Sequence, residues 1–211
     1  MSVLVFVENI EGKFKKSAFE VVSYAKTIAN TLNQKLTAVS IGDVNDTTLE
    51  SLGKYGVDKI LNVDSDKLKS FINQAYASII AQAAKKEDAD IIVLSNSFSG
   101  KGLAPRIAAK LEAGLADGAV SLPEINENGF RIKKTAFSGK AFAITELTSS
   151  IKIIAPNANS FELKEEITTP EITAFEADLL SQDFNTVVKE IVRTTDKISL
   201  PEAVIVVSGG R

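Results

Sequence analysis

The sequence contains no cysteine and no histidine among its 211 residues. Without these two residue types the chain cannot build a Cys/His zinc site, an iron–sulfur cluster or a haem site with His or Cys ligands. A thiol nucleophile and a Ser-His-Asp triad are excluded for the same reason. The absence of cysteine also fits a reducing compartment. Most familiar catalytic centres are therefore ruled out before any motif is considered.

The chain has little excess charge and no long apolar run. Its formal net charge is -3 and its pI is about 5.2, so no overall positive field attracts nucleic acid or an anionic membrane. The apolar run from Val3 to Val7 stops at Glu8, which is too short for a signal peptide or a membrane span. We expect a cytoplasmic protein with neither a nucleic-acid partner nor membrane insertion.

The first half of the chain alternates short apolar runs with stretches of helical period. The apolar runs at 3–7, 36–41, 59–63 and 91–94 predict strands that are buried on both faces. Apolar residues at three- and four-residue spacing predict helices over 18–32, with Ser17 as N-cap, over 68–83, and over 103–112, with Gly114 at the C′ position. Such alternation is typical of βαβ units on a parallel sheet.

After Gly114 the apolar period becomes two-fold. Strands are predicted at 120–125, 130–135, 141–145 and 151–154, with a hairpin turn at Asn128-Gly129. We interpret them as antiparallel strands that extend or flank the parallel sheet. The predicted fold class is therefore α/β, a three-layer α/β/α sandwich with a mostly parallel sheet and an antiparallel β edge, in an N-terminal domain of residues 1–156.

Beyond residue 156 the composition becomes acidic. Residues 157–183 contain seven acidic residues and one basic residue, Lys164, which predicts an acidic linker or arm over 157–202 with a strand at 186–194. A specific acidic docking surface is the alternative. A buried strand is predicted at 203–207, followed by Ser208, Gly209, Gly210 and Arg211, where a βα unit turns into its helix. We expect residues 203–211 to begin a missing C-terminal domain, so that the chain is truncated.

One segment has the position of an anion site. Residues 97–102, Ser-Phe-Ser-Gly-Lys-Gly, follow a predicted strand and open a helix, where free N–H groups and the helix dipole favour anions. The segment matches neither GxGxxG nor GxxxxGK[ST], and Pro105, placed in the first turn, removes one donor. A glycine turn capped by serine is the alternative. Arg106 and Lys110, one turn apart, are either an anion clamp or a solvated helix face.

The remaining candidates are weaker. Ser208-Gly209-Gly210 after a strand is similar to the pyrophosphate loop of ATP pyrophosphatases, but the pattern does not continue past Arg211. Two acidic pairs have the spacing of magnesium ligands, although caps and turns explain them equally: Asp64 with Asp66, and Asp88 with Asp90. Three tyrosines are interpreted as packing residues: Tyr24, Tyr55 and Tyr76. No catalytic residue and no metal site is predicted.

Several stretches together resemble the alpha subunit of an electron-transfer flavoprotein, over essentially the whole chain. The specific stretches are GKGLAPRIAAKL at 100–111 and VVSGGR at 206–211. Weaker ones are VLVFVE at 3–8 with Gly12, YGVDK at 55–59 and SGKA at 138–141. One departure is Ala155 before Pro156, where many relatives have Arg-Pro.

The resemblance implies a heterodimer of alpha and beta subunits in which FAD lies mainly in the C-terminal domain of alpha. It implies an electron carrier that accepts electrons from flavin dehydrogenases such as acyl-CoA dehydrogenase and passes them to a quinone reductase or another acceptor. The flavin then performs the redox step, and no catalytic residue is needed from this chain. It also implies that Ser208, Gly209, Gly210 and Arg211 lie beside the FAD, although the chain alone is not expected to bind it. The antiparallel strands between 120 and 154 are the expected docking surface for the beta subunit.

A function of another class stays open, namely a free-standing adenine-nucleotide-binding α/β module. That hypothesis requires a glycine-rich phosphate loop after the first strand. Glu8 and Glu11 occupy this place, and their carboxylates would repel phosphate.

Overall fold

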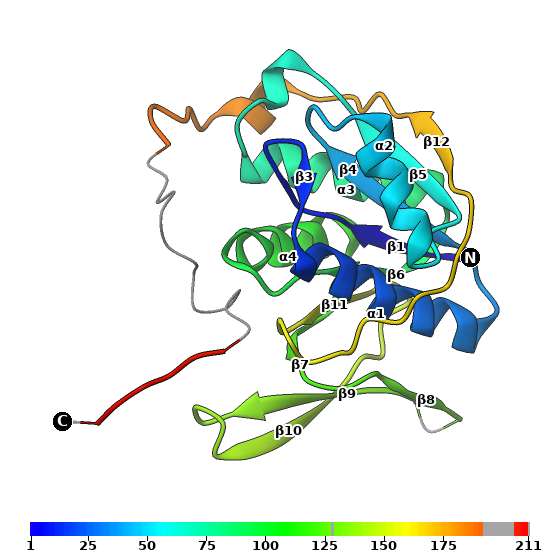
Figure 1. Ribbon diagram of the computed structural model, residues 1–211, viewed down its shortest axis with the longest axis vertical. Helices are drawn as coiled ribbons and strands as arrows, with labels where there is room; N and C mark the ends of the chain where they lie inside the picture. The colour runs from blue at the N-terminus through cyan, green and yellow to red at the C-terminus, as the bar shows by residue number, and fades with distance from the viewer. Residues whose placement is uncertain (128, 192–204, 211) are drawn as a thin grey trace.

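A large twisted sheet forms the centre of the molecule (Figure 1). The computed structural model describes residues 1–127, 129–191 and 205–210, and within them the sheet has ten strands. Nine strands follow the order β10-β9-β7-β11-β6-β1-β4-β5-β12, and β8 pairs with β9. The strands are β1 (Ser2–Phe6), β4 (Leu36–Ile41), β5 (Lys59–Val63), β6 (Ala89–Leu94), β7 (Gly114–Ala119), β8 (Glu124–Asn126), β9 (Gly129–Ala136), β10 (Ala141–Glu146), β11 (Lys152–Pro156) and β12 (Glu171–Ala174). A small hairpin of β2 (Asn9–Ile10) and β3 (Lys13–Phe14) follows β1.

The central strands are parallel, from β7 through β11, β6, β1, β4 and β5 to β12. The strands predicted at 3–7, 36–41, 59–63 and 91–94 are confirmed as β1, β4, β5 and β6. Every residue of β1 and β4 is buried, as expected for strands that are covered on both faces.

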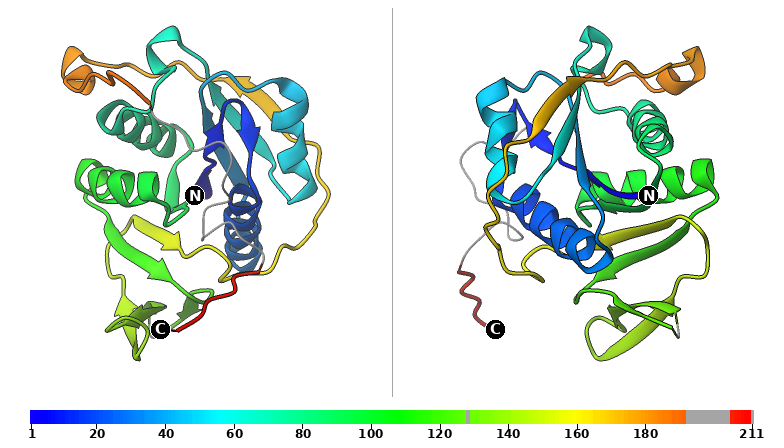
Figure 2. Two further views of the ribbon diagram at one scale, coloured as in Figure 1. Left: turned by 60° about the vertical axis from the view of Figure 1, so that its left-hand side comes forward. Right: turned by 90° about the vertical axis from the view of Figure 1, so that its right-hand side faces the viewer.

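Helices cover both faces of the sheet (Figure 2). One face carries α1 (Lys16–Leu32) and α2 (Asp46–Glu50), and the other carries α3 (Asn73–Lys86) and α4 (Phe98–Leu111). Three short 3-10 helices complete the described elements, namely η1 (Ser51–Lys54), η2 (Asp66–Leu68) and η3 (Ser181–Phe184). The predicted three-layer α/β/α sandwich is confirmed.

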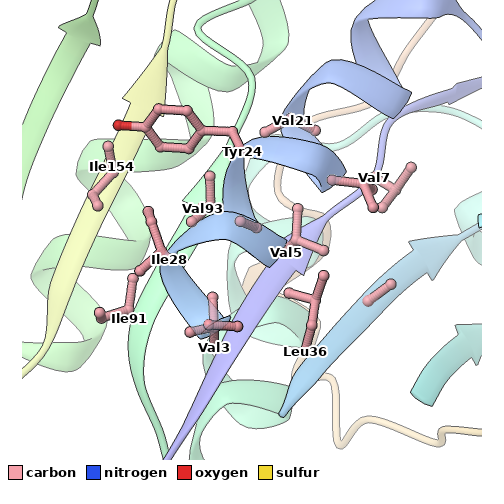
Figure 3. Close-up of a cluster of buried hydrophobic side chains, with 14 of the residues drawn as sticks. Val3, Val5, Val7, Val21, Tyr24, Ile28, Leu36, Ile91, Val93 and Ile154 are labelled. Carbon is pink, nitrogen blue, oxygen red and sulfur yellow. The ribbon is translucent and has the colours of Figure 1, made fainter. Parts of the chain in front are cut away.

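Residues 3–7, in β1 and directly after it, divide alternately between two cores. Val3, Val5 and Val7 face α1, and Figure 3 shows them among Tyr24, Ile28, Leu36 and Val93. Leu4 and Phe6 enter the second core with α3 and α4. The hydroxyl of Tyr24 donates to the backbone oxygen of Ser121 at 2.8 Å, so even the polar end of this buried ring is satisfied.

Several bounds and caps of the predicted helices are wrong. The helix predicted over 68–83 is α3, which begins at Asn73 and ends at Lys86. Helix α1 begins at Lys16, two residues earlier than an N-cap at Ser17 allows, because Lys15 is its extended N-cap. Helix α4 begins at Phe98 rather than 103, because Ser97 caps it, and this places Pro105 inside the helix rather than in its first turn. Its left-handed C-cap is Glu112 (φ 52°), and Gly114 instead opens β7.

The predicted antiparallel edge is confirmed in part. The hairpin of β9 and β10 is present, with β8 pairing antiparallel to β9. The strand predicted at 120–125 reduces to β8, and β7 was not predicted because its sequence, GLADGA, lacks large apolar residues. The strand at 151–154 is not antiparallel: β11 lies parallel between β6 and β7, where both faces are covered and residues 153–156 are buried.

The acidic segment runs around the domain as an arm, defined here as residues 157–184 (Figure 1). It passes along α1, where the ring of Phe161 meets Tyr24 edge to face at 5.5 Å. It then crosses η1, where the Thr168 N–H donates to the Gly53 oxygen at 2.8 Å. Next it adds β12 to the free edge of β5, and it ends over α3.

Charged side chains attach the arm to the domain. Lys26, only 8% exposed, lies between the carboxylates of Asp58 (3.4 Å) and Glu166 (3.5 Å). At the far end Asp183 is 5% exposed and accepts hydrogen bonds from Ser78 Oγ (2.6 Å) and the Leu180 N–H (3.0 Å). Several acidic residues of the arm therefore face the chain itself.

The strand predicted at 186–194 is absent over 186–191, and residues 192–194 lie outside the described part. Of the strand predicted at 203–207, residues 203 and 204 are also outside it. Residues 205–207 are irregular and exposed, and no strand or helix of the described part of the chain covers them. Division of the chain at residues 156 and 202 stays a proposal.

Among the described residues, no helix has the length and apolar character needed to cross a membrane.

Helix α4 lies so close to the strand before it that only glycine fits at position 100. A Cβ built on Gly100 would lie 1.8 Å from the Ser95 backbone oxygen, so the helix would have to shift. We expect Gly100→Ala to lower the free energy of unfolding by about 1–3 kcal/mol, measured by urea denaturation. Gly102→Ala is the matched control, because its Cβ would meet only the side chain of Asn73. Equal effects of the two substitutions would contradict this explanation.

The buried carboxylate of Asp183 predicts a local stability effect. Asp183→Ala leaves Ser78 Oγ and the Leu180 N–H without their acceptor, which costs about 1–3 kcal/mol. Hydrogen exchange should show faster exchange over residues 175–184. Asp178→Ala is the control, because Asp178 contacts Gln82 through its backbone and its side chain is exposed. Unchanged exchange in the Asp183 variant would contradict this prediction, because the other contacts of the arm would then be enough to hold residues 175–184 in place.

Candidate functional site

The topology points to one edge of the sheet as the place to look for a site. The connection from β1 to β4 passes through α1 on one face, and that from β5 to β6 passes through α3 on the other. Since β1 and β6 are neighbours, the direction of winding changes between their carboxyl ends. Open α/β sheets bind their ligands at such a point. The candidate site therefore lies between the segment after β1, which contains Glu8, and residues 95–97 after β6.

Glu8 and Ser97 occupy this point and bond to each other. Ser97 Oγ donates to Glu8 Oε1 at 2.5 Å and accepts from the Gly100 N–H at 2.9 Å. The carboxylate therefore lies next to the N-terminus of α4. Burial raises the pKa of Glu8 above its ordinary value, and the hydrogen bond from Ser97 opposes this rise. The bond between Glu8 and Ser97 was not predicted, although Glu8 was noted as the end of the first strand.

Residues 97–102 were interpreted either as an anion site or as a glycine turn capped by serine, and this arrangement decides between the two. The segment does open a helix after a strand, but its N-terminus is capped by Ser97 and faces a carboxylate of the same chain. A phosphate there would meet the negative charge of Glu8. Gly100 is required by the close approach to Ser95, and no ligand is needed to explain it. The geometry supports the capped glycine turn and argues against the adenine-nucleotide module.

Two asparagines join the neighbouring loops. Asn96, after β6, donates from Nδ2 to Oδ1 of Asn157, after β11, at 2.7 Å. Their backbone N–H groups bond to Pro156 and Ala119 respectively, both at 3.0 Å. Asn96 Oδ1 is buried and has no hydrogen-bond partner in the described part of the chain. Sequence reasoning missed this pair, and an asparagine one or two residues after each of two buried strands was the available signal.

A small crevice lies beside these residues, between α1 and the start of the arm. It is lined by Ser17, Glu20, Val21, Tyr24, Ser95, Pro156, Asn157, Ala158 and Phe161. It has room for about one water molecule. An isoalloxazine ring does not fit there.

Three of the four residues predicted to lie beside FAD belong to the described part of the chain. Ser208, Gly209 and Gly210 are exposed, and a Cβ on either glycine would meet nothing within 4 Å. Arg211 lies outside the described residues. The described residues thus provide accessible backbone at 208–210 but no walls that would enclose a flavin. The role of these four residues stays a prediction.

Four of the other candidate groups have partners in the described part of the chain. Asp66 pairs with Lys69 at 2.6 Å, and Asp88 pairs with the N-terminal amine at 3.0 Å. Arg106 donates to the Gly102 oxygen, and Lys110 lies 3.9 Å from Asp183. The described residues hold no group of three acidic side chains placed for a metal ion.

The three tyrosines are packing residues, as interpreted. Tyr24 and Tyr76 are buried, and Tyr55 stacks on Phe19 with ring centroids 5.0 Å apart. Burial raises the pKa of Tyr76 to about 12.

The raised pKa of Glu8 predicts a pH dependence. Because the folded state holds this proton more tightly than the unfolded state, stability falls as pH rises through and above the ordinary glutamate range. Glu8→Gln keeps an acceptor for Ser97 and removes the charge. We expect it to be more stable than wild type at pH 8, by a margin that shrinks at pH 4, in urea denaturation at both pH values. Exposed Glu50, replaced by Gln, is the control. A stability difference between Glu8→Gln and wild type that is the same at both pH values would contradict a raised pKa of Glu8.

Comparison with known proteins identifies the family of the chain. The family described as "Electron transfer flavoprotein domain" matches residues 3–180. "Electron transfer flavoprotein subunit alpha" of Bacillus subtilis is 28% identical over 99% of this chain and 64% of its own length. "Protein FixB" of Clostridium saccharobutylicum is 30% identical with the same coverages. "Lactate dehydrogenase (NAD(+),ferredoxin) subunit LctC" of Acetobacterium woodii is 27% identical over 99% of this chain and 51% of its own.

The chain thus spans about 64% of the length of the first two of these relatives. The family match covers the sandwich and most of the arm, including the carboxyl edge of the sheet. The chain therefore belongs to the electron transfer flavoprotein family.

Proposed function

We propose that the chain acts as an alpha-type subunit of an electron-transfer flavoprotein, a carrier that takes electrons from flavin dehydrogenases and passes them to a quinone reductase or another acceptor. The family match over residues 3–180 carries this proposal. The geometry agrees with it, because the edge where an α/β sheet usually binds its ligand is occupied by Glu8 and Ser97. Residues 1–156 then serve as a structural and interface domain without catalytic residues of their own.

The cofactor of this proposed carrier is FAD, held in a heterodimer with a beta-type subunit. Ser208, Gly209, Gly210 and Arg211 contribute one side of its site. The exposed backbone of 208–210 supports this, since its N–H groups are accessible to a ligand. FAD supplies the redox chemistry when bound, and the protein positions it and adjusts its electrostatic surroundings. Residues 203–211 would begin the domain that encloses it, after the acidic arm and linker of 157–202.

The proposed electron donors are flavin dehydrogenases such as acyl-CoA dehydrogenase, and the proposed location is the cytoplasm. One relative is named "Acryloyl-CoA reductase electron transfer subunit beta", and it is 25% identical to this chain. Its name supports a donor or acceptor that handles a CoA thioester.

Co-expression with a beta-type subunit tests the proposal. The chain alone should be colourless, because residues 1–127, 129–191 and 205–210 do not enclose a flavin. An alpha-type subunit that carries this chain should form a complex with the beta-type subunit and retain stoichiometric FAD, measured by absorbance after gel filtration. A titration of the chain with AMP and ATP is the counter-test. Tight nucleotide binding by the chain alone, together with failure to form the complex, would favour the adenine-nucleotide module.

The proposed role of Arg211 gives a second test. Its guanidinium stays charged at any relevant pH and would stabilise a reduced, anionic flavin. In the FAD-loaded heterodimer we expect Arg211→Ala to lower the flavin reduction potential, measured by spectroelectrochemistry. Arg106→Ala is the control, because Arg106 is exposed on α4 and bonds only to Gly102 among the described residues. An Arg211 variant with wild-type potential and FAD affinity would remove Arg211 from the cofactor site.

A further inference from the structure

The crevice between α1 and the start of the arm contains hydroxyl groups that the chain itself does not satisfy. Ser95, directly after β6, lines the crevice and is only 8% exposed. Its hydroxyl forms no hydrogen bond with any residue in the described part of the chain. Ser17, in the first turn of α1, lines the same crevice, and its hydroxyl has no partner among the described residues either. A buried hydroxyl without a partner destabilises a fold, so Ser95 calls for a partner that the chain does not supply.

Glu20 brings a carboxylate to the crevice, although it is only 7% exposed. Its Oε1 pairs with the Lys16 amine at 3.3 Å, and its Oε2 accepts a hydrogen bond from the Asn159 N–H at 3.0 Å. Each carboxylate oxygen can accept more than one hydrogen bond. The crevice therefore combines two hydroxyls, which can donate or accept, with two oxygens that can only accept.

The size and charge of the crevice restrict what can occupy it. It has room for about one water molecule, so a larger ligand does not fit. An anion of similar size would meet the negative charge of Glu20. A buried water molecule typically forms about three hydrogen bonds to polar groups that lack other partners. Ser17, Ser95 and Glu20 offer that number of polar side chains.

We propose that the crevice binds one ordered water molecule, held by the hydroxyls of Ser95 and Ser17 and by the carboxylate of Glu20. The water then joins α1 to the segment that follows β6. Asn157 and Phe161 of the arm line the same crevice and close it. The water is thus a structural part of the junction at which the arm leaves the sheet.

A second buried serine provides the matched control for this proposal. Ser40 on β4 is 0% exposed, and its Oγ is buried without a hydrogen-bond partner in the described part of the chain. Ser40 does not line the crevice. Both serines therefore lack a partner within the described chain, but only Ser95 has room for a water molecule beside it. Replacement by alanine should affect the two positions differently.

Urea denaturation of Ser95→Ala and Ser40→Ala tests this difference. We expect Ser95→Ala to raise the equilibrium constant of unfolding about two- to tenfold, because a bond between the protein and its bound water is lost. Ser40→Ala should leave this constant unchanged or lower it, because it removes a hydroxyl that has no partner to lose. Both substitutions remove one oxygen atom from a buried serine, so the loss of side-chain volume is the same.

Two further measurements locate the effect. A high-resolution crystal structure of the chain should show a density peak within about 3.0 Å of Ser95 Oγ, inside the crevice. Hydrogen exchange over residues 157–161 should become faster in Ser95→Ala and stay unchanged in Ser40→Ala, because only the first variant loosens the start of the arm.

The outcomes decide for or against the water. If Ser95→Ala is as stable as wild type or more stable, as Ser40→Ala is expected to be, the crevice is dry and the proposal is wrong. An empty crevice in the crystal structure would lead to the same conclusion. The denaturation is repeated at low and at high sodium chloride concentration. A destabilisation by Ser95→Ala that appears only at high salt would assign the crevice to an ion and overturn the water, whereas an equal destabilisation at both concentrations supports it.

Discussion

The structure depends on the burial of β1 from both sides. Val3, Val5 and Val7 require the cover of α1, and Leu4 and Phe6 require the cover of α3 and α4. A strand buried in this way must have a paired neighbour on each edge, which β4 and β6 supply. Each added strand has the same requirement in turn. The sheet therefore grows outward until β12 on one side and the antiparallel hairpin on the other end it.

Close packing also explains several residues of the stretches at 55–59 and 100–111, on which the resemblance to the family rests. Gly100 is required because α4 starts directly against Ser95. Gly56 has a positive φ of 88°, and a Cβ there would meet the buried side chain of Lys26. Asp58 accepts from the Leu36 N–H at the start of β4 and pairs with the same lysine. In the sequence alone, a glycine-rich segment such as 97–102 suggests ligand binding. In this domain its glycine at position 100 is needed for close packing instead.

The sequence predicted the parallel core because continuous apolar runs and helical periods are local signals. It could not predict β7, because the small residues of this strand carry no strand signal and because its partner β11 pairs with it from 38 residues further along the chain, as Gly114 opposite Lys152 shows. The parallel direction of β11 was missed for a related reason. The period of the apolar residues predicts that a segment is a strand, but it does not predict which strands pair with it. At the site, Glu8 and Ser97 were both noted, yet their hydrogen bond joins residues 89 apart. The arm looked like a solvated linker because composition does not show that Asp183 is buried against Ser78.

The arm has a consequence for the way the polypeptide is made. Its contacts join residues far apart in sequence, such as Ser23 with Lys164 and Gln82 with Asp178. On a ribosome, which releases the chain from its N-terminus, β5 emerges more than a hundred residues before β12 can cover its edge. During this interval one edge of β5, a largely apolar strand, is unpaired. The arm thus completes the sheet at the end of synthesis. Before the arm is made, the free edge of β5 is the part of the nascent domain that most needs protection by a chaperone.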